Sequence, residues 1–261
     1  MKNTEKSLIR TFGRIHGKRL SARQQWLVDN ILPCVIPSGQ RPTRDPVGPG
    51  NENIPDNKHL DYQKNNHVPD NFAAQNFRDD TAILEIGFGA GEHLLHLAET
   101  FPNLDITGAE PFMNGVASLL SRMTNDKGEV KQEYKNIRIW PDDIHKLLHA
   151  TGGPQPYIRI YILHPDPWPK ARHVKRRLLS AEFLNELAAR LTPGGEIIIG
   201  TDHTDYFEWI LSQTAASKLR IANDDFLVPP ESGLDTRYMK KNKFGSERPA
   251  YLVLRHAQQP L

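Results

Sequence analysis

The stretch AILEIGFGAGEHLLHLA, residues 82–98, decides the fold class of this chain. It begins with a short apolar run typical of a buried strand, and apolar residues at helical spacing follow the glycines. Gly87, Gly89 and Gly91 let the backbone turn sharply and approach a ligand closely, while the start of the helix offers free N–H groups. Strand, glycine turn and helix in this order predict a site for a nucleotide-like cofactor.

The acidic Glu85, just before the first glycine, narrows the choice of cofactor. The glycines are spaced G-x-G-x-G, whereas the dinucleotide fingerprint is G-x-G-x-x-G. A carboxylate at this point would repel a pyrophosphate, but it suits the amino group of an amino-acid-bearing cofactor. S-Adenosylmethionine carries such a group and has no phosphate.

Two strand ends downstream also carry carboxylates. Residues 104–109 (LDITGA) predict a strand that leads to Glu110, at the distance where an acidic residue commonly binds ribose hydroxyls. The strand at 138–140 leads to Asp142 and Asp143, and a carboxylate there can bind the adenine amino group. Alternatively, Asp142 or Asp143 caps the helix IHKLLHA, which leaves the other open to ligand contact.

Residues 157–163 (YIRIYIL) predict a further buried strand, which leads into HPDPWPK at 164–170. Prolines on both sides of Asp166 stiffen this loop at a strand end, where ligands of open α/β sheets bind. Taken alone, the loop fits a solvated turn as well as a site, and Trp168 fits stacking on a base as well as walling a pocket. Carboxylates at four strand ends favour the site.

The remaining chain fits a doubly wound sheet. Apolar residues from Leu179 to Leu191 recur at helical spacing, and Thr192-Pro193-Gly194-Gly195 is expected to end that helix. Strands are expected at 196–200 and at 250–256. We expect residues 1–80 to form a basic arm, a short helix at 21–31 capped by Ser21, and a Pro/Asn-rich loop at 33–70. Residues 81–261 are expected to form the catalytic domain.

Four tracts together resemble the bacterial tRNA (guanine-N7)-methyltransferase family, from about residue 82 to residue 256: EIGFGAGEHL, HPDPWPKARHVKRRL, Thr201-Asp202-His203 and Thr236-Arg237-Tyr238. The resemblance implies an α/β fold with a mostly parallel, seven-stranded sheet of the Rossmann-like S-adenosylmethionine-dependent methyltransferase type. It also implies methyl transfer to N7 of a variable-loop guanosine, position 46 in tRNA convention.

The same resemblance implies roles for individual residues. Glu85, Glu110 and Asp142 would contact S-adenosylmethionine beside the glycine turn, and Asp166 would be catalytic. Substrate contacts are implied for Lys170, Asp202, Thr236, Arg237, Tyr238 and Met239. Met239 stands where the family usually has Glu, so recognition of the guanine edge is expected to depend more on Asp166 and Asp202.

The distribution of charge is more informative than the formal net charge of +2. Basic residues crowd the first 23 positions, and two further clusters lie at 170–177 and 237–243. Each cluster alone is more simply a solvated face, but three clusters, two of them flanking the proposed site, favour a tRNA phosphate backbone as partner. Backbone contacts are expected at Arg172, Lys175, Arg176 and Arg177.

The N-terminus lacks the apolar h-region of a secretion signal, and no apolar run is long enough to span a membrane. We therefore expect a cytoplasmic protein, although a mitochondrial-type presequence remains open. The single Cys34 excludes an internal disulfide and an all-cysteine zinc site, and the histidines lack metal-ligand spacing. Neither a metal nor an obligate protein partner is implied.

Two rival functions come from other classes. A nicotinamide-dependent oxidoreductase would explain the glycine turn and Glu110, but it gives the Asp-Pro-Trp tract no role. A catalytically silent RNA-binding protein on the same fold would keep the basic clusters, and it predicts tRNA binding without cofactor binding.

Overall fold

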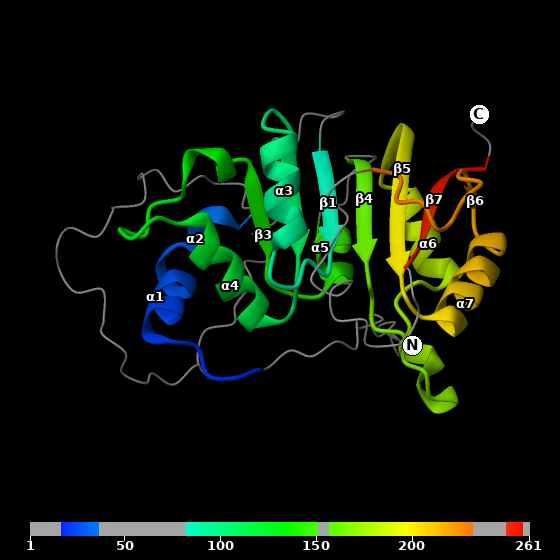
Figure 1. The fold of residues 1–261 in the computed structure, drawn as a ribbon, viewed down its shortest axis with the longest axis horizontal. Coiled ribbons are helices and arrows are strands. Elements are labelled where there is room, and N and C mark those ends of the chain that lie inside the picture. The colour runs from blue at the N-terminus through cyan, green and yellow to red at the C-terminus, as the bar shows by residue number, and fades with distance from the viewer. Residues whose placement is uncertain (1–16, 37–81, 151–156, 232–248, 258–261) are drawn as a thin grey trace, which may run out of the picture.

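A seven-stranded sheet forms the centre of the structure, a computed structural model that describes residues 17–36, 82–150, 157–231 and 249–257 (Figure 1). The strand order is β3-β2-β1-β4-β5-β7-β6. The strands are β1 (Ala82–Ile86), β2 (Asp105–Ala109), β3 (Ile137–Trp140), β4 (Tyr157–Leu163), β5 (Leu191–Thr201), β6 (Leu219–Ile221) and β7 (Ala250–His256). β1 to β5 pair in parallel, whereas β7 runs antiparallel to both β5 and β6. This arrangement confirms the predicted fold class.

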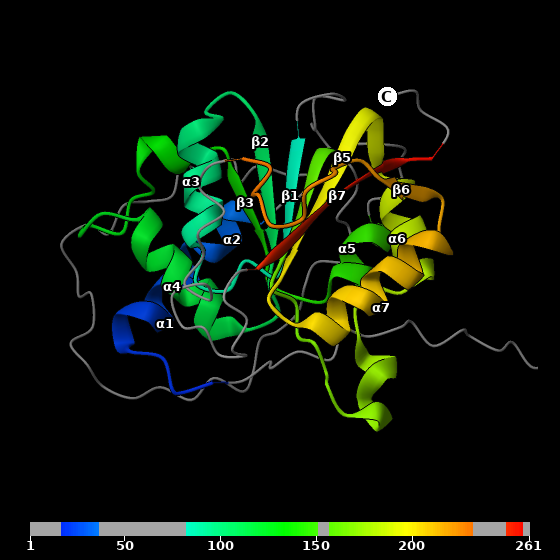
Figure 2. The same ribbon diagram turned by 45° about the vertical axis from the view of Figure 1, so that its right-hand side comes forward.

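Helices cover both faces of the sheet (Figure 2). One side carries α1 (Ala22–Asn30), α2 (Leu32–Val35), α3 (Glu92–Thr100) and α4 (Met113–Met123), and the other carries α5 (Ile144–Ala150), α6 (Ala181–Ala188) and α7 (Thr204–Ala215). In the described residues, the 3-10 helices η1 (Gln132–Tyr134) and η2 (Ala171–Arg176) lie in connections. Because strand side chains alternate between faces, Ile83 joins the core under α3 and α4, while Leu84 joins the core under α6.

The order of the strands creates a crevice between β1 and β4. From β1 the chain proceeds through β2 to β3 on one side, and it then returns to place β4 on the other side of β1. Ligands of open α/β sheets bind at such a switch point, outside the carboxyl ends of the strands. The fold therefore brings the loops after β1, β2, β3 and β4 to one edge.

Two details differ from the sequence-based expectation. β5 begins at Leu191, which pairs with Tyr157 of β4, so the prediction that Leu191 continues the preceding helix was wrong. The helix ends at Ala188 because the chain must turn into the strand, and Gly194 takes a positive φ of 80° where the strand is irregular. The short β6 was not expected, since its three residues show no periodicity.

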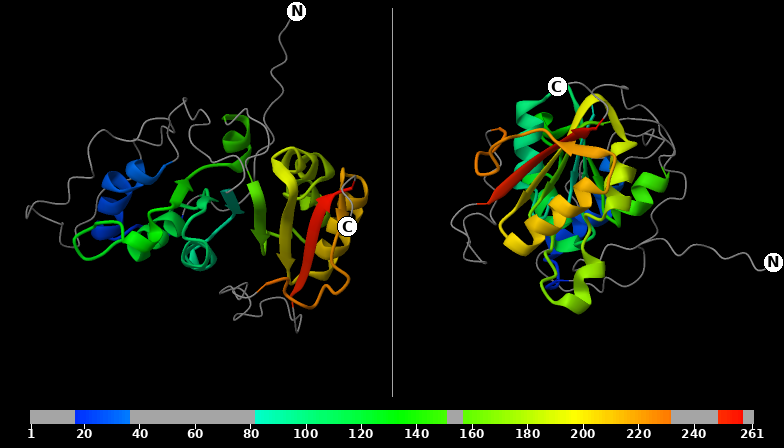
Figure 3. Two further views of the ribbon diagram at one scale, coloured as in Figure 1. Left: turned by 90° about the horizontal axis from the view of Figure 1, so that it is seen from above. Right: turned by 90° about the vertical axis from the view of Figure 1, so that its right-hand side faces the viewer.

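The helix expected at 21–31 is confirmed as α1, and Ser21 caps it. Ser21 Oγ accepts a hydrogen bond from the Gln24 N–H (3.2 Å), and Gln24 Oε1 accepts one from the Ser21 N–H (3.1 Å). α1 packs against α4, and both N-terminal helices lie at the opposite end of the sheet from β6 and β7 (Figure 3). The basic arm before residue 17 and most of the Pro-rich loop lie outside the described residues, and the division at residue 80 stays a prediction.

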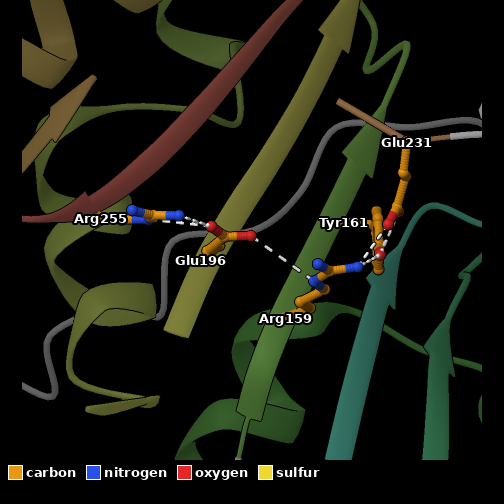
Figure 4. Close-up of polar contacts among 5 residues, drawn as sticks. All are labelled: Arg159, Tyr161, Glu196, Glu231 and Arg255. Atoms are coloured by element: carbon orange, nitrogen blue, oxygen red, sulfur yellow. Dashed lines mark hydrogen bonds and ion pairs between the residues drawn. The ribbon is translucent and has the colours of Figure 1, made fainter. Parts of the chain in front are cut away.

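A row of polar contacts crosses one face of the sheet (Figure 4). Arg255 Nε on β7 donates to Glu196 Oε1 on β5 (2.9 Å), and Glu196 Oε2 lies 3.7 Å from Arg159 Nε on β4. Arg159 and Tyr161, both on β4, donate to the two carboxylate oxygens of Glu231. The segment that follows β6 is thereby fastened to the strand that leads to Asp166.

Candidate cofactor and substrate site

A cavity of about 290 Å³ lies at the carboxyl ends of the strands and brings the predicted strand ends together. Gly87 and Gly89 line it after β1, Glu110 after β2, Asp142 after β3 and Asp166 after β4. Further wall residues are Ile86, Ala109, Pro111, Phe112, Ile144, Leu163, His164, Pro165, Trp168, Arg176 and Leu178. The convergence of carboxylates and glycines therefore follows from the topology alone.

The three glycines of the turn divide into two roles, although all have positive φ. A Cβ atom at Gly87 or Gly89 would meet nothing within 4 Å, so these residues keep open space beside the backbone. A Cβ atom at Gly91 would lie 2.5 Å from Leu119 Cδ1 of α4, and Gly91 does not line the cavity. Gly87 and Gly89 therefore leave space for a ligand in the cavity, whereas Gly91 allows close packing at the start of α3.

Glu110 is a buried carboxylate that holds the glycine turn. Its Oε2 accepts the N–H of Gly89 and its Oε1 accepts the N–H of Phe112, each at 2.8 Å. Burial raises the pKa of Glu110 to about 7, against the opposing effect of these hydrogen bonds, and the charges of Asp166 and Glu85 add to the rise. Glu110 therefore titrates near neutral pH.

Glu85 lies behind the glycine turn rather than in the cavity wall. It is buried, and its Oε2 lies 3.3 Å from Nδ1 of the buried His93 on α3. Within the described residues, Oε2 has no hydrogen-bond partner. The contact of Glu85 with a cofactor amino group stays a prediction.

The two adjacent aspartates after β3 have different roles. Asp143 Oδ1 accepts the N–H of His145 at 2.9 Å, so Asp143 caps α5. Asp142 lines the cavity, and its Oδ2 lies 2.7 Å from Nζ of Lys146. Asp142 is therefore the residue of this pair that faces the cavity.

The loop after β4 is strongly bent around Asp166. His164 and Trp168 both have positive φ, at 53° and 43°, which is rare for residues other than glycine. Asp166 is exposed to solvent, yet partial burial of its carboxyl group raises its pKa. Trp168 lines the cavity, and Arg176 Cζ lies 5.0 Å from the centre of its ring. In this structure Trp168 walls the pocket and supports Arg176.

His164 is a site residue that the sequence did not indicate. It lines the cavity, and its Nδ1 lies 3.8 Å from Oδ1 of Asp202, which follows β5. Burial lowers the pKa of His164 even though Asp202 opposes this effect. The only sequence signal is its position directly after a buried strand.

The basic side chains that follow Asp166 do not all lie on one exposed surface. Lys170, Arg172 and Lys175 are exposed, as a phosphate-binding role requires. Arg177 is instead buried: its Nε donates to the Pro167 carbonyl (2.9 Å), and its guanidinium lies over the rings of Tyr206 and Trp209. The predicted phosphate contact is therefore withdrawn for Arg177, because its cationic group is held inside the protein.

The predicted substrate residues Thr236, Arg237, Tyr238 and Met239 lie outside the described residues. Within the described part of the chain, no cluster of three or more His, Cys, Asp or Glu side chains is suited to hold a metal ion. No helix in those same ranges is long and apolar enough to cross a membrane.

Comparison with known proteins gives consistent matches. The family described as "Putative methyltransferase" matches residues 79–244. The tRNA (guanine-N(7)-)-methyltransferase of Erythrobacter litoralis is 35% identical over 258 residues, which cover 92% of this chain and 92% of that protein. The protein of the same name from Sphingopyxis alaskensis is 36% identical over 242 residues, covering 90% of this chain and 89% of the relative. Among solved structures, the 16S rRNA methyltransferase KamB covers 69% of this chain and 89% of its own, with 18% identity and a TM-score of 0.47.

Proposed function

The chain belongs to the tRNA (guanine-N(7)-)-methyltransferase family. We propose that it acts in the cytoplasm and transfers the methyl group of S-adenosyl-L-methionine to N7 of the variable-loop guanosine at position 46 of tRNA. The observation that carries the proposal is the single cavity on which Gly89, Glu110, Asp142 and Asp166 converge. A nicotinamide-dependent oxidoreductase would leave Asp166 and its bent loop without a role.

The residues present fit S-adenosyl-L-methionine. The open space beside Gly87 and Gly89 admits a ligand against the backbone, and Glu110 and Asp142 offer acceptors for ribose hydroxyls and for the adenine amino group. Glu85 is placed by sequence next to this cradle and is proposed to bind the amino group of the methionine moiety. When bound, S-adenosyl-L-methionine supplies a methyl group activated by a sulfonium sulfur.

Asp166 is proposed to hold the guanine. N7 of guanine carries an in-plane lone pair at neutral pH, so methyl transfer requires no general base. The Asp166 carboxylate would accept hydrogen bonds from the N1–H and the N2 amino group, and its negative charge would favour the cationic product. Catalysis then arises from alignment of the two reactants and from electrostatics.

The RNA is proposed to reach the cavity over η2. Lys170, Arg172 and Lys175 are exposed there, and Arg176 reaches the cavity wall. Asp202 and the segment from Thr236 to Met239 would add contacts to the guanine edge. A variable-loop base suits this site because a base outside a helix can be splayed out and read on its edges.

The proposal is tested by incubating the purified protein with unmodified tRNA and labelled S-adenosyl-L-methionine. Borohydride reduction followed by aniline treatment cleaves RNA at N7-methylguanosine, so we expect cleavage at one variable-loop guanosine. A tRNA transcript with adenosine at that position is the matched control and should take up no label. Label without cleavage would mean methylation at another atom, and tRNA binding without label would favour a silent RNA-binding protein.

A further inference from the structure

Residues 17–19, at the N-terminal side of α1, lie against the wall of the cavity. A Cβ atom at Gly17 would lie 2.3 Å from Asn114 Oδ1 and 2.7 Å from Phe112 Cζ, so only glycine permits this approach. Asn114 Nδ2 donates to the carbonyl oxygen of Lys18 at 2.5 Å. Because Phe112 lines the cavity, this contact places Gly17 beside the cavity wall, and Lys18 and Arg19 follow it directly in the chain.

α1 holds this segment in place. Arg23 donates from its guanidinium to the carbonyl oxygens of Asn125 (2.7 Å) and Asp126 (3.1 Å). The ring of Trp26 packs on Gly128, where a Cβ atom would lie 2.6 Å from it. The backbone from Gly17 to α1 is therefore fixed on α4 and on the loop that follows α4.

Both of these side chains carry a positive charge and face solvent. Lys18 and Arg19 are exposed. The segment that leads into α1, drawn in blue, lies at the same edge of the sheet as η2 in two views (Figures 1 and 2). Phe112 follows β2 and Trp168 precedes η2 after β4, and β1 lies between these strands. The two basic groups therefore flank the cavity from opposite sides.

A nucleotide inserted into a pocket keeps a phosphate on each side, so its backbone must leave the cavity mouth in two directions. The basic residues of η2 can bind the backbone in only one of these two directions. We propose that Lys18 and Arg19 form a second phosphate-binding rim, so that the tRNA backbone spans the cavity from η2 to the start of α1. This inference rests on the proposed function and adds a binding surface to it.

The test compares two double variants by the salt dependence of tRNA binding between about 50 and about 200 mM salt. Lys18→Ala with Arg19→Ala should weaken tRNA binding and lower the slope of log K against log salt by about 1 to 2, since each phosphate contact contributes about 0.7 to 0.9. Lys135→Ala with Lys218→Ala removes the same charge from exposed positions before β3 and β6, at the opposite edge of the sheet, and should leave the slope unchanged. Thermal unfolding should be the same for all three proteins.

Two further measurements separate this inference from others. Asn114→Ala keeps both charges but removes the hydrogen bond to Lys18, and we expect an intermediate loss of tRNA affinity. A Lys18/Arg19 variant with the slope of the wild type, or one that loses only affinity for S-adenosylhomocysteine, would overturn the second rim. Failure of the wild type to methylate tRNA would instead refute the proposed function, so the two failures are distinguishable.

Discussion

The carboxylate of Glu110, after β2, accepts a 2.8 Å hydrogen bond from the N–H of Gly89, after β1. The same carboxylate accepts the N–H of Phe112, so it links the glycine turn to the start of α4. A ligand that donates ribose hydroxyls to Glu110 would meet a group already fixed in position. Its raised pKa makes this contact dependent on pH.

We expect the affinity for S-adenosylhomocysteine to increase as the pH rises through about 7, because ionised Glu110 is the better acceptor for two hydroxyls. The stability of the free protein should change in the opposite direction. The folded-state pKa of Glu110, about 7, exceeds the ordinary value of 4.5, so the protonated carboxyl group favours the folded state. The free energy of unfolding should therefore fall as the pH rises from 4.5 to about 7. Calorimetric titration from about pH 6 to about pH 8 measures the affinity.

Glu110→Gln is the control for this pH dependence. It cannot ionise, so the part of the affinity change due to Glu110 should disappear, while any titration of the ligand itself remains in both proteins. A variant with the same pH profile as the wild type would show that Glu110 does not contact the ligand.

The cavity was predictable from the sequence for a topological reason. Carboxyl ends of parallel strands meet at one edge of a sheet, so Glu110, Asp142 and Asp166 converge whatever the details of the helices. The choice between Asp142 and Asp143 was not predictable, because both residues suit a cap and only the path of the backbone assigns the cap to Asp143.

Three basic residues that are adjacent in the sequence have different environments in the structure. Lys175, Arg176 and Arg177 form a uniform cluster in the sequence, but they lie in and just after a 3-10 helix, which turns successive side chains about a third of a turn apart. Lys175 therefore faces solvent, Arg176 lies over Trp168, and Arg177 enters the core. No local pattern distinguishes these three environments.

Asp166→Asn should lower turnover by about 100-fold or more while the affinity for S-adenosylhomocysteine stays close to that of the wild type. The amide removes the negative charge that would favour a cationic product. Burial raises the pKa of Asp166, so this carboxylate is protonated earlier as the pH is lowered. Wild-type turnover should therefore begin to fall at a higher pH than it would with an aspartate of ordinary pKa. Single-turnover rates at saturating tRNA provide the measurement, with Asp224→Asn, an exposed aspartate, as control. Undiminished turnover in Asp166→Asn would remove this residue from the mechanism.

Arg177→Ala should affect the stability of the protein, whereas Lys175→Ala should affect tRNA binding. Arg177→Ala removes a buried hydrogen bond and two ring contacts, so we expect a loss of about 2 to 4 kcal/mol in the free energy of unfolding. Lys175→Ala should leave unfolding unchanged and lower the salt slope of tRNA binding by about 0.7 to 0.9. Denaturant unfolding and tRNA titration at several salt concentrations measure both effects, and a stable Arg177→Ala with an altered salt slope would restore its predicted contact with RNA.

Gly115, in α4, packs directly against the glycine turn. The sequence around Gly115 gives no sign of a functional role. A Cβ atom at Gly115 would lie 2.2 Å from the carbonyl oxygen of Gly89. Replacing a helical glycine by alanine ordinarily stabilises a protein by about 1 kcal/mol, but here the methyl group must push the turn into the cavity. We therefore expect Gly115→Ala to weaken S-adenosylhomocysteine binding about tenfold or more, because the cradle loses its geometry. Gly194→Ala is the control: unlike Gly115, Gly194 has a positive φ, its Cβ atom would meet nothing within 4 Å, and it lies in β5 away from the cavity. It should reduce stability without changing affinity, and equal affinities in Gly115→Ala and wild type would show that the turn accommodates the methyl group without moving.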